Sequence, residues 1–189
     1  MGFQDETWWS RFRQPHLASW SPEQEPLRLI EQTLTADDPD PKALACYGML
    51  LRWASASQET HEKMLLRFVE GRPVSAITTQ FLTWACQELE ELGLSVLAMI
   101  WDNASWHISQ TVRQWIRAHN RAVKSQGQGV RVVACFLPVK SPWLNPIEPK
   151  WAHAKRRIVE PAAVLTKQTL ADRVCDTFQC KHLSHLAIT

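Results

Sequence analysis

Apolar and polar positions in the first part of the chain follow the short, bounded pattern of strands. A loose alternation rich in Thr and Trp predicts a strand at residues 3–11. Apolar runs at 43–54 and 64–69 predict two more, although either run also fits a short helix. A short pairing strand is predicted at 17–20, after a proline turn, and the composition of residues 21–42, rich in Pro, Asp and Glu, indicates a loop.

The pattern then changes to the period of a helix. Thr78 or Thr79 is placed to cap a helix that ends at Gly93. Its apolar stripe consists of Phe81, Leu82, Ala85, Leu89 and Leu92. Further helices are predicted at residues 109–124, 146–159 and 170–178.

Two near-continuous apolar runs separate these helices, at residues 94–101 and 130–137. Such runs are typical of strands that are covered on both faces. Strands joined by turns pair antiparallel, whereas strands joined through helices pair parallel. The element order therefore predicts an α/β fold with a mixed five-stranded sheet, three antiparallel strands followed by two parallel ones, flanked by helices. A length of 189 residues fits a single domain over residues 1–189.

Composition excludes several classes of protein. Hydrophobic residues make up 45% of the chain, which is too many for a disordered one. No apolar run approaches the roughly 18 residues that a membrane span needs, and the first residues resemble no secretory signal. Ten Trp stand against one Tyr, an imbalance that we expect to reflect the core or the walls of a site.

Charge and cysteine content are less decisive. A net charge of +2 argues neither for nor against a nucleic-acid partner. Five scattered cysteines without a signal peptide indicate reduced side chains in a cytosolic protein. A stripe of cations at helical spacing is more often a solvated face than a phosphate-binding one; it comprises Arg113, Arg117, Arg121 and Lys124. A group of Cys and His residues near the C-terminus fits no standard spacing of zinc ligands, which favours a structural role. The group comprises Cys175, Cys180, His182 and His185.

Asp102 is the first candidate for chemistry. It follows a predicted strand directly, and ligands of open α/β sheets bind at the carboxyl ends of strands. The alternative is a capping or turn residue before the next helix.

Glu148 is the second candidate. The sequence Asn145-Pro146-Ile147-Glu148 is a good helix start, so Glu148 also fits the third position of a capping box. The rigid, aromatic loop before it and the cations after it favour a site instead.

Asp5 and Glu6 are the third pair. In an alternating strand they face opposite sides of the sheet, and acids are disfavoured in mid-strand. Three acids from separate elements suit hard divalent cations, which prefer oxygen ligands. Two such ions activate a water or 3′-hydroxyl in phosphodiester cleavage. The sequence has no nucleophile-elbow motif and no glycine-rich phosphate loop.

Three segments carry a resemblance: FQDETWW at residues 3–9, WDNASWH at 101–107, and LPVKSPWLNPIEPKWAHAKRR at 137–157. Together they resemble the catalytic domain of mariner-related insertion-sequence transposases, which are DDE superfamily endonucleases. The last segment is the most specific. The resemblance spans nearly the whole chain and implies an RNase H-like fold.

The resemblance also implies roles for individual residues. Asp5, Asp102 and Glu148 would be the catalytic acids and the ligands of two Mg²⁺ or Mn²⁺ ions. Asn103, His107 and Asn145 would support them. Contacts to the DNA backbone are implied for Lys140, Lys150, Lys155, Arg156 and Arg157. Such contacts position the strand without reading its sequence.

The implied function is cleavage and strand transfer at insertion-sequence ends, with transposon ends and target DNA as partners. We expect a homodimer in the bacterial cytoplasm, associated with the nucleoid when bound to DNA. Members of the family usually carry an N-terminal helix-turn-helix region, which we expect to be absent here, so that recognition of transposon ends would be lost or supplied by a separate helix-turn-helix chain. Two alternatives stay open: an inactive remnant that binds DNA or a partner chain, and an RNase H-like nuclease.

Overall fold

A computed structural model describes residues 1–12, 35–55, 57–158 and 164–188 of the chain. The centre of the fold is a five-stranded sheet in the order β3-β2-β1-β4-β5. Strand β1 (Gly2–Ser10) pairs antiparallel with β2 (Ala43–Ala54), and β2 pairs antiparallel with β3 (Thr60–Val69). On its other side, β1 is parallel to β4 (Val96–Trp101), which is parallel to β5 (Arg131–Phe136). The predicted mixed sheet is therefore confirmed.

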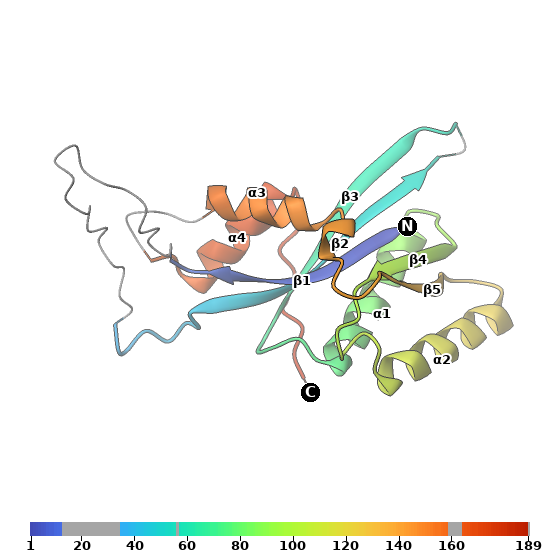
Figure 1. The fold of residues 1–189 in the computed structure, drawn as a ribbon, viewed down its shortest axis with the longest axis horizontal. Coiled ribbons are helices and arrows are strands. Elements are labelled where there is room, and N and C mark those ends of the chain that lie inside the picture. The colour runs from blue at the N-terminus through green and yellow to red at the C-terminus, as the bar shows by residue number, and fades with distance from the viewer. Residues whose placement is uncertain (13–34, 56, 159–163, 189) are drawn as a thin grey trace.

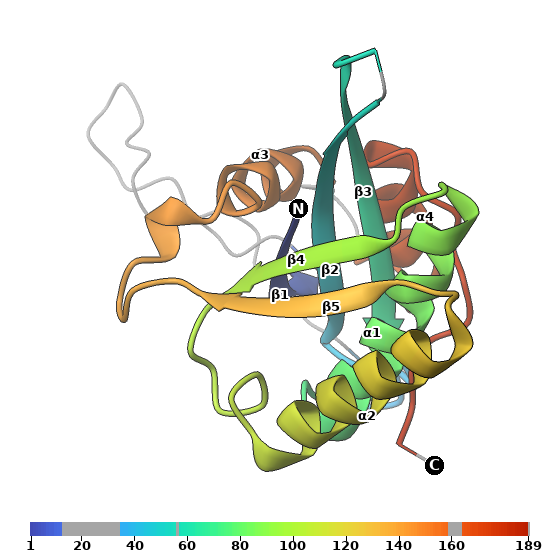
Figure 2. The ribbon, with the colours of Figure 1, turned by 90° about the vertical axis from the view of Figure 1, so that its right-hand side faces the viewer.

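Helices cover both faces of this sheet (Figure 1). Helices α1 (Ser75–Glu91) and α2 (Gln110–Gln126) lie on one face, and their apolar stripes close a core around Met49, Leu97 and Trp101. Helices α3 (Glu148–Ile158) and α4 (Lys167–Thr177) lie on the other face. Figure 2 shows the two helical layers with the twisted sheet between them. None of the described helices is long and apolar enough to cross a membrane.

The predicted strand boundaries largely agree with the structure. The strand predicted at 43–54 is β2, and the one predicted at 64–69 extends back to Thr60. The short strand predicted at 17–20 falls outside the described residues, as do much of the loop predicted at 21–42 and the last residue of the helix predicted to end at 159.

The prediction that the two late strands are covered on both faces is wrong. In β4 buried residues alternate with more exposed ones, and Val96 is 55% exposed. Strand β5 forms the edge of the sheet, where Val133 and Phe136 are 47% and 42% exposed. Helix α2 covers the face of β5 that carries Val132, so Val133 on the other face stays in contact with solvent. Phe136 shares the covered face and stacks on Trp101, but it stays partly open at the end of the strand.

Three helix starts also differ from the prediction, and one of them is that of α4, which begins at Lys167 rather than at residue 170. Helix α1 begins at Ser75, and Thr78 is a buried residue of its first turn rather than a cap. The Thr78 hydroxyl lies 3.0 Å from the Tyr47 hydroxyl, a contact between helix and sheet that local sequence does not reveal. Helix α3 begins at Glu148, after a single 3₁₀ turn, η1 (Pro142–Leu144).

Candidate active site

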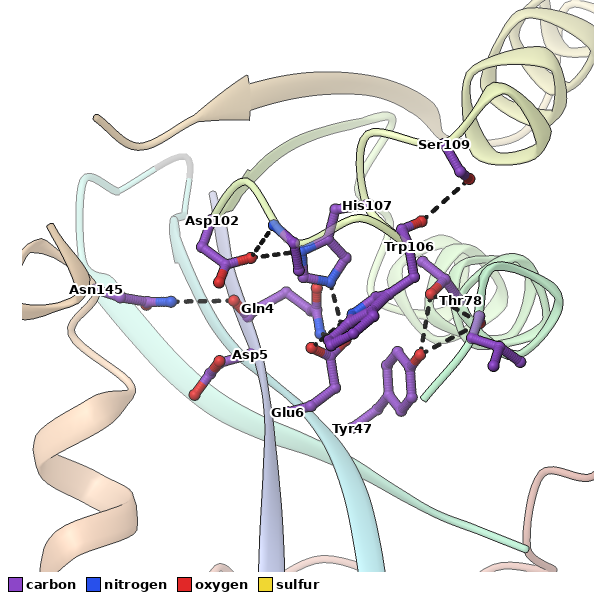
Figure 3. A network of polar contacts seen from close by, with 12 residues as sticks. Gln4, Asp5, Glu6, Tyr47, Thr78, Asp102, Trp106, His107, Ser109 and Asn145 are labelled. Atoms are coloured by element: carbon purple, nitrogen blue, oxygen red, sulfur yellow. Dashed lines mark hydrogen bonds and ion pairs between the residues drawn. The ribbon is translucent and has the colours of Figure 1, made fainter. Parts of the chain in front are cut away.

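Strand β1 presents its two acids to opposite faces of the sheet, as the alternation predicts. Asp5 faces α3, where its Oδ2 accepts a hydrogen bond from Trp151 Nε1 at 2.9 Å. Glu6 faces the other layer, where Trp106 and His107 approach its carboxylate (Figure 3). The two neighbouring carboxylates therefore have separate surroundings and separate roles.

The Asp5 carboxyl is held in a strongly negative environment. Burial raises its pKa to about 7, and the charges of Glu148 and Glu6 act in the same direction. The hydrogen bond from Trp151 opposes this shift, but does not cancel it. Asp5 therefore carries a negative charge that the surrounding protein compensates poorly, and a cation beside it would relieve the repulsion.

Gly48 provides the space in which Trp151 reaches Asp5. It lies opposite Asp5 in the β1–β2 ladder. A Cβ atom at Gly48 would clash with Cζ2 and Cη2 of Trp151 and lie 3.2 Å from Leu66. The sequence analysis did not single out Gly48, although a glycine inside an apolar strand is a known signal of close approach by another group.

Asp102 lies next to Asp5 across the sheet. The parallel β1–β4 ladder pairs Phe3 with Ile100, and Asp5 and Asp102 each follow two residues later. Side chains two residues apart on a strand share one face. Figure 3 shows both carboxylates on the side of β1 that also faces Asn145. The Asp102 side chain is 55% exposed, so it is open to a ligand.

A buried imidazole links Asp102 to Glu6. His107 Nδ1 lies 2.8 Å from Asp102 Oδ1, and its Nε2 lies 2.9 Å from Glu6 Oε1. The ring stacks on Trp101 with a centroid distance of 4.7 Å. This arrangement fixes the position of one oxygen of Asp102, and the Ala104 amide donates to the same oxygen at 2.9 Å.

Charge reinforces this arrangement. Burial acts to lower the pKa of His107, but its hydrogen bonds to Asp102 and Glu6 outweigh burial and raise the pKa to about 9. The hydrogen bond from His107 in turn holds the pKa of Asp102 below its usual value, although burial opposes that shift. At neutral pH, Asp102 is thus an anion with one oxygen anchored. The predicted supporting position of His107 gains a physical basis from these contacts.

Glu6, a candidate together with Asp5 but without a predicted role, holds the partners of the site in place. Besides His107, it accepts hydrogen bonds from Trp106 Nε1 at 3.0 Å and from Gln4 Nε2 at 2.8 Å. Its side chain is 7% exposed. The signal was the acid in mid-strand beside Asp5, but nothing local could indicate that its partners come from the loop after β4.

Glu148 begins α3, and the capping-box alternative is wrong. In a capping box the glutamate side chain would accept from the Asn145 amide, but that amide donates to the Pro142 carbonyl at 2.8 Å. Asn145 is instead buried, and its Nδ2 donates to the Gln4 carbonyl at 3.0 Å. This bond ties the start of α3 to β1 beside Asp5 and leaves the Glu148 carboxylate free of a capping role.

The chemistry of the donor set fits a hard divalent cation. Asp5, Asp102 and Glu148 offer only carboxylate oxygens, which Mg²⁺ and Mn²⁺ prefer. Burial is the main cause of the raised pKa of Asp5, and the charge of Glu148 raises this pKa further. Within the described residues, no group of three or more His, Cys, Asp or Glu side chains is placed to hold a metal ion, and this includes Asp5, Asp102 and Glu148. DDE endonucleases generally depend on divalent metal ions.

The predicted DNA-contacting cations fall into two groups. Lys140, Arg156 and Arg157 are exposed, Lys140 in the loop after β5 and the two arginines on α3. Lys150 is paired with Glu62, and Lys155 lies 5.8 Å from the centroid of the Trp9 ring. Burial lowers the pKa of Lys155, while the charges of Asp5 and Glu148 oppose that shift. Lys155 therefore belongs electrostatically to the acids as much as to the surface.

The remaining predicted residues are distributed as follows. Asn103 Nδ2 donates to the Leu137 carbonyl at 2.8 Å and so joins the ends of β4 and β5. Trp143 is 74% exposed and Trp8 is 48% exposed, whereas Trp101 is fully buried on the face away from Asp5. The tryptophans therefore divide between core, support of the acids, and open surface.

Comparison with known proteins identifies a family and a similar fold. A family model described as DDE superfamily endonuclease matches residues 41–171, a range that includes Asp102 and Glu148. Among solved structures, the Mos1 transposase paired-end complex with left transposon end has a similar fold, with a TM-score of 0.59 at 14% sequence identity.

That similarity covers 95% of this chain and 48% of the Mos1 chain, so this chain spans about half the length of its structural relative. A search of curated proteins gives no significant match. The mixed sheet with its two helical layers is the RNase H-like fold of a transposase catalytic domain, as predicted. The chain belongs to the DDE superfamily endonucleases.

Proposed function

We propose that this chain is the catalytic domain of a mariner-related DNA transposase, which cleaves phosphodiester bonds at insertion-sequence ends and joins the freed 3′ ends to target DNA. One observation carries the proposal. Asp5 and Asp102 lie side by side on the same face of neighbouring strands, and the charge of Glu148 acts on Asp5 from the start of α3. This placement supports a shared site for acids from three distant parts of the sequence.

In this proposal, Asp5, Asp102 and Glu148 hold the catalytic Mg²⁺ or Mn²⁺ ions. Bound divalent ions stabilise the charge that develops during phosphodiester displacement and favour deprotonation of the attacking water or hydroxyl. The remaining groups position the acids: His107 orients Asp102, Trp151 orients Asp5, and Asn145 anchors the start of α3.

DNA is the proposed partner. The Mos1 relative was solved on a transposon end. In this chain the exposed cations Lys140, Arg156 and Arg157 flank the acids and suit contacts to phosphates. The exposed ring of Trp143, in the loop just before Glu148, offers a surface on which an unpaired base can stack.

Residues 1–189 form the catalytic domain alone in this proposal. A helix-turn-helix region outside them supplies recognition of transposon ends, and the active species is a homodimer.

The test is nicking of supercoiled plasmid in Mn²⁺, combined with a gel-shift measurement of DNA binding. We expect the wild type to nick, and Asp102→Asn to bind DNA equally well without nicking, because it keeps the shape but loses the charge of the acid. Asp176→Asn, an exposed acid on α4, is the matched control and should nick like the wild type. Equal nicking by wild type and Asp102→Asn would overturn the catalytic assignment.

Two further outcomes separate the alternatives. If wild type and Asp102→Asn bind DNA and neither nicks, the chain is a binding remnant without turnover. If the wild type cleaves an RNA–DNA hybrid and leaves duplex DNA intact, the activity is that of an RNase H-like nuclease. The proposed transposase requires cleavage of duplex DNA.

A further inference from the structure

A second cluster of metal-binding side chains lies far from the acids, where the C-terminal segment returns to the edge of the sheet. After α4 the chain runs past β3, and Leu186 forms a parallel bridge with Val69 (Figure 2). Arg67 Nη2 donates to the Ser184 carbonyl at 2.7 Å in the same region. His182 and His185 lie on this returning segment.

The two imidazole rings face each other through the same type of nitrogen. His182 Nε2 and His185 Nε2 are 3.3 Å apart. Each ring turns its other nitrogen to a carboxylate: His182 Nδ1 lies 2.7 Å from Asp172 Oδ1, and His185 Nδ1 lies 2.7 Å from Glu70 Oε1. A carboxylate at Nδ1 favours the tautomer with the proton on that nitrogen, in which both neutral rings direct a lone pair at the gap between them. Gln168 Nε2 lies 3.2 Å from His182 Nδ1 and also donates to the Asp172 carboxylate.

Two lone pairs that face each other across 3.3 Å repel unless an electrophile lies between them. Two imidazole nitrogens bound to one tetrahedral Zn²⁺, with bonds of about 2.0–2.1 Å, are about 3.3–3.4 Å apart. The observed separation therefore matches a pair of metal ligands. Carboxylates that hydrogen-bond the remote nitrogen of a ligating histidine are the usual outer partners of a metal site.

From this geometry we propose that His182 and His185 bind a transition-metal ion of the Zn²⁺ class, with Asp172 and Glu70 as the outer partners that orient the two rings. Neutral imidazole suits Zn²⁺, Cu²⁺ and Ni²⁺, and does not suit Mg²⁺. This site is distinct from the acids of the active site in both position and ligand chemistry.

The surroundings leave room for the rest of the coordination sphere. An open hollow of about 460 Å³ lies in front of the rings and is lined in part by Gln168 and Ser184. No third His, Cys, Asp or Glu in the described part of the chain completes the group, so water fills the remaining positions.

The two cysteines that the sequence places nearby do not take part. Cys175 is buried in the core between the sheet and α4. Cys180 Sγ is directed at the Met64 carbonyl at a distance of 3.0 Å. The bound ion would instead connect three elements, because its ligands lie on the C-terminal segment and their partners lie on α4 and directly after β3. We expect the bound ion to stabilise the packing of the C-terminal segment against the edge of the sheet.

Isothermal titration of the full chain with ZnCl₂, in buffer with excess Mg²⁺ to saturate the carboxylate site, tests the proposal. We expect one Zn²⁺ per chain for the wild type and for Asp102→Asn. His182→Gln and His185→Gln should each weaken binding at least tenfold, and Asp172→Asn should weaken it about 10-fold to 100-fold through the lost outer partner. Circular dichroism confirms that each variant is folded.

Two further readouts do not depend on calorimetry. Saturating Zn²⁺ should raise the Tm of the wild type by roughly 5 °C or more, since a ligand at a hundred times its Kd stabilises the folded state. Co²⁺ in place of Zn²⁺ should give visible absorption that disappears in His185→Gln. Identical Zn²⁺ titration curves for the wild type and both histidine variants would overturn the proposal. The contact between the rings of His182 and His185 would then be a hydrogen bond through one shared proton.

Discussion

Gly48→Ala tests the link between the packing of α3 and the environment of Asp5. The added Cβ would overlap Cζ2 and Cη2 of Trp151, which is buried. The ring has little room to move. It packs edge-on against Trp9 at 5.8 Å and against Phe178 at 5.4 Å, and its Nε1 donates to Asp5. One methyl group must therefore displace a large, well-held ring or the strand itself.

The expected loss of stability follows from these contacts. Overpacking of a well-packed core costs about 1–3 kcal/mol. Loss of the hydrogen bond from Trp151 to Asp5 adds about 1 kcal/mol. We expect Gly48→Ala to lower the free energy of unfolding by about 2–4 kcal/mol, which corresponds to a Tm decrease of roughly 5–15 °C for a chain of this size. Because Asp5 loses its donor, nicking in Mn²⁺ should also decrease.

Urea denaturation of four proteins measures this effect: wild type, Gly48→Ala, Trp151→Phe and the double variant. Phe lacks the outer ring that carries Cζ2 and Cη2, so the alanine methyl should be tolerated much better in the Trp151→Phe background. We expect a coupling free energy of at least about 1 kcal/mol between the two sites. Purely additive effects, or a Gly48→Ala protein as stable as the wild type, would refute the reasoning.

Two other substitutions test charged contacts at the middle of β1 and directly after its end. His107→Leu removes the buried cation between Glu6 and Asp102 and should lower the free energy of unfolding by about 3 kcal/mol in a denaturant titration. The control Ser105→Ala, at an exposed neighbour, should change this free energy by less than about 0.5 kcal/mol. Equal stability of His107→Leu and the wild type would contradict a stabilising role for this contact. Arg11 is buried and pairs with Asp38, and its hydrogen bond holds the pKa of that carboxyl below its usual range. The ion pair therefore stabilises the folded state at pH values above the ordinary Asp pKa, and this stabilisation is lost as the pH falls below about 4. Arg11→Met should therefore make unfolding less pH-dependent between about pH 4 and pH 2, and an unchanged acid dependence would show that the pair does not carry this effect.

Much of the fold could be predicted from local pattern. Alternation at residues 3–11 and the apolar run at 43–54 gave strands with nearly the observed boundaries, because side-chain period and turn residues act over a few positions. Ser109 and Gly127 bound α2 as cap and stop, as their side chain and positive φ allow. The start of α1 was misplaced because Thr78 bonds to Tyr47 of the sheet, a partner that lies far away in sequence.

The candidate site was predictable only in part. The mid-strand acids, the acid after β4 and the Asn-Pro-Ile-Glu segment indicated Asp5, Asp102 and Glu148 as candidates, and the resemblance to transposases assigned their roles. The supporting contacts were not readable in the same way. Glu6 and Asp102 share His107, and Gly48 leaves space for Trp151, across separations that no local pattern spans.

The sequence by itself determined the order of helices and strands, the faces on which side chains alternate, and the family motif, because these depend on neighbouring residues. Tertiary structure decided the rest. It determined that β5 is a half-open edge, that Glu148 is free of a capping role, and that two histidines near the C-terminus face each other between carboxylates. Such contacts depend on how distant elements pack, and packing is a property of the whole sheet and its two helical layers.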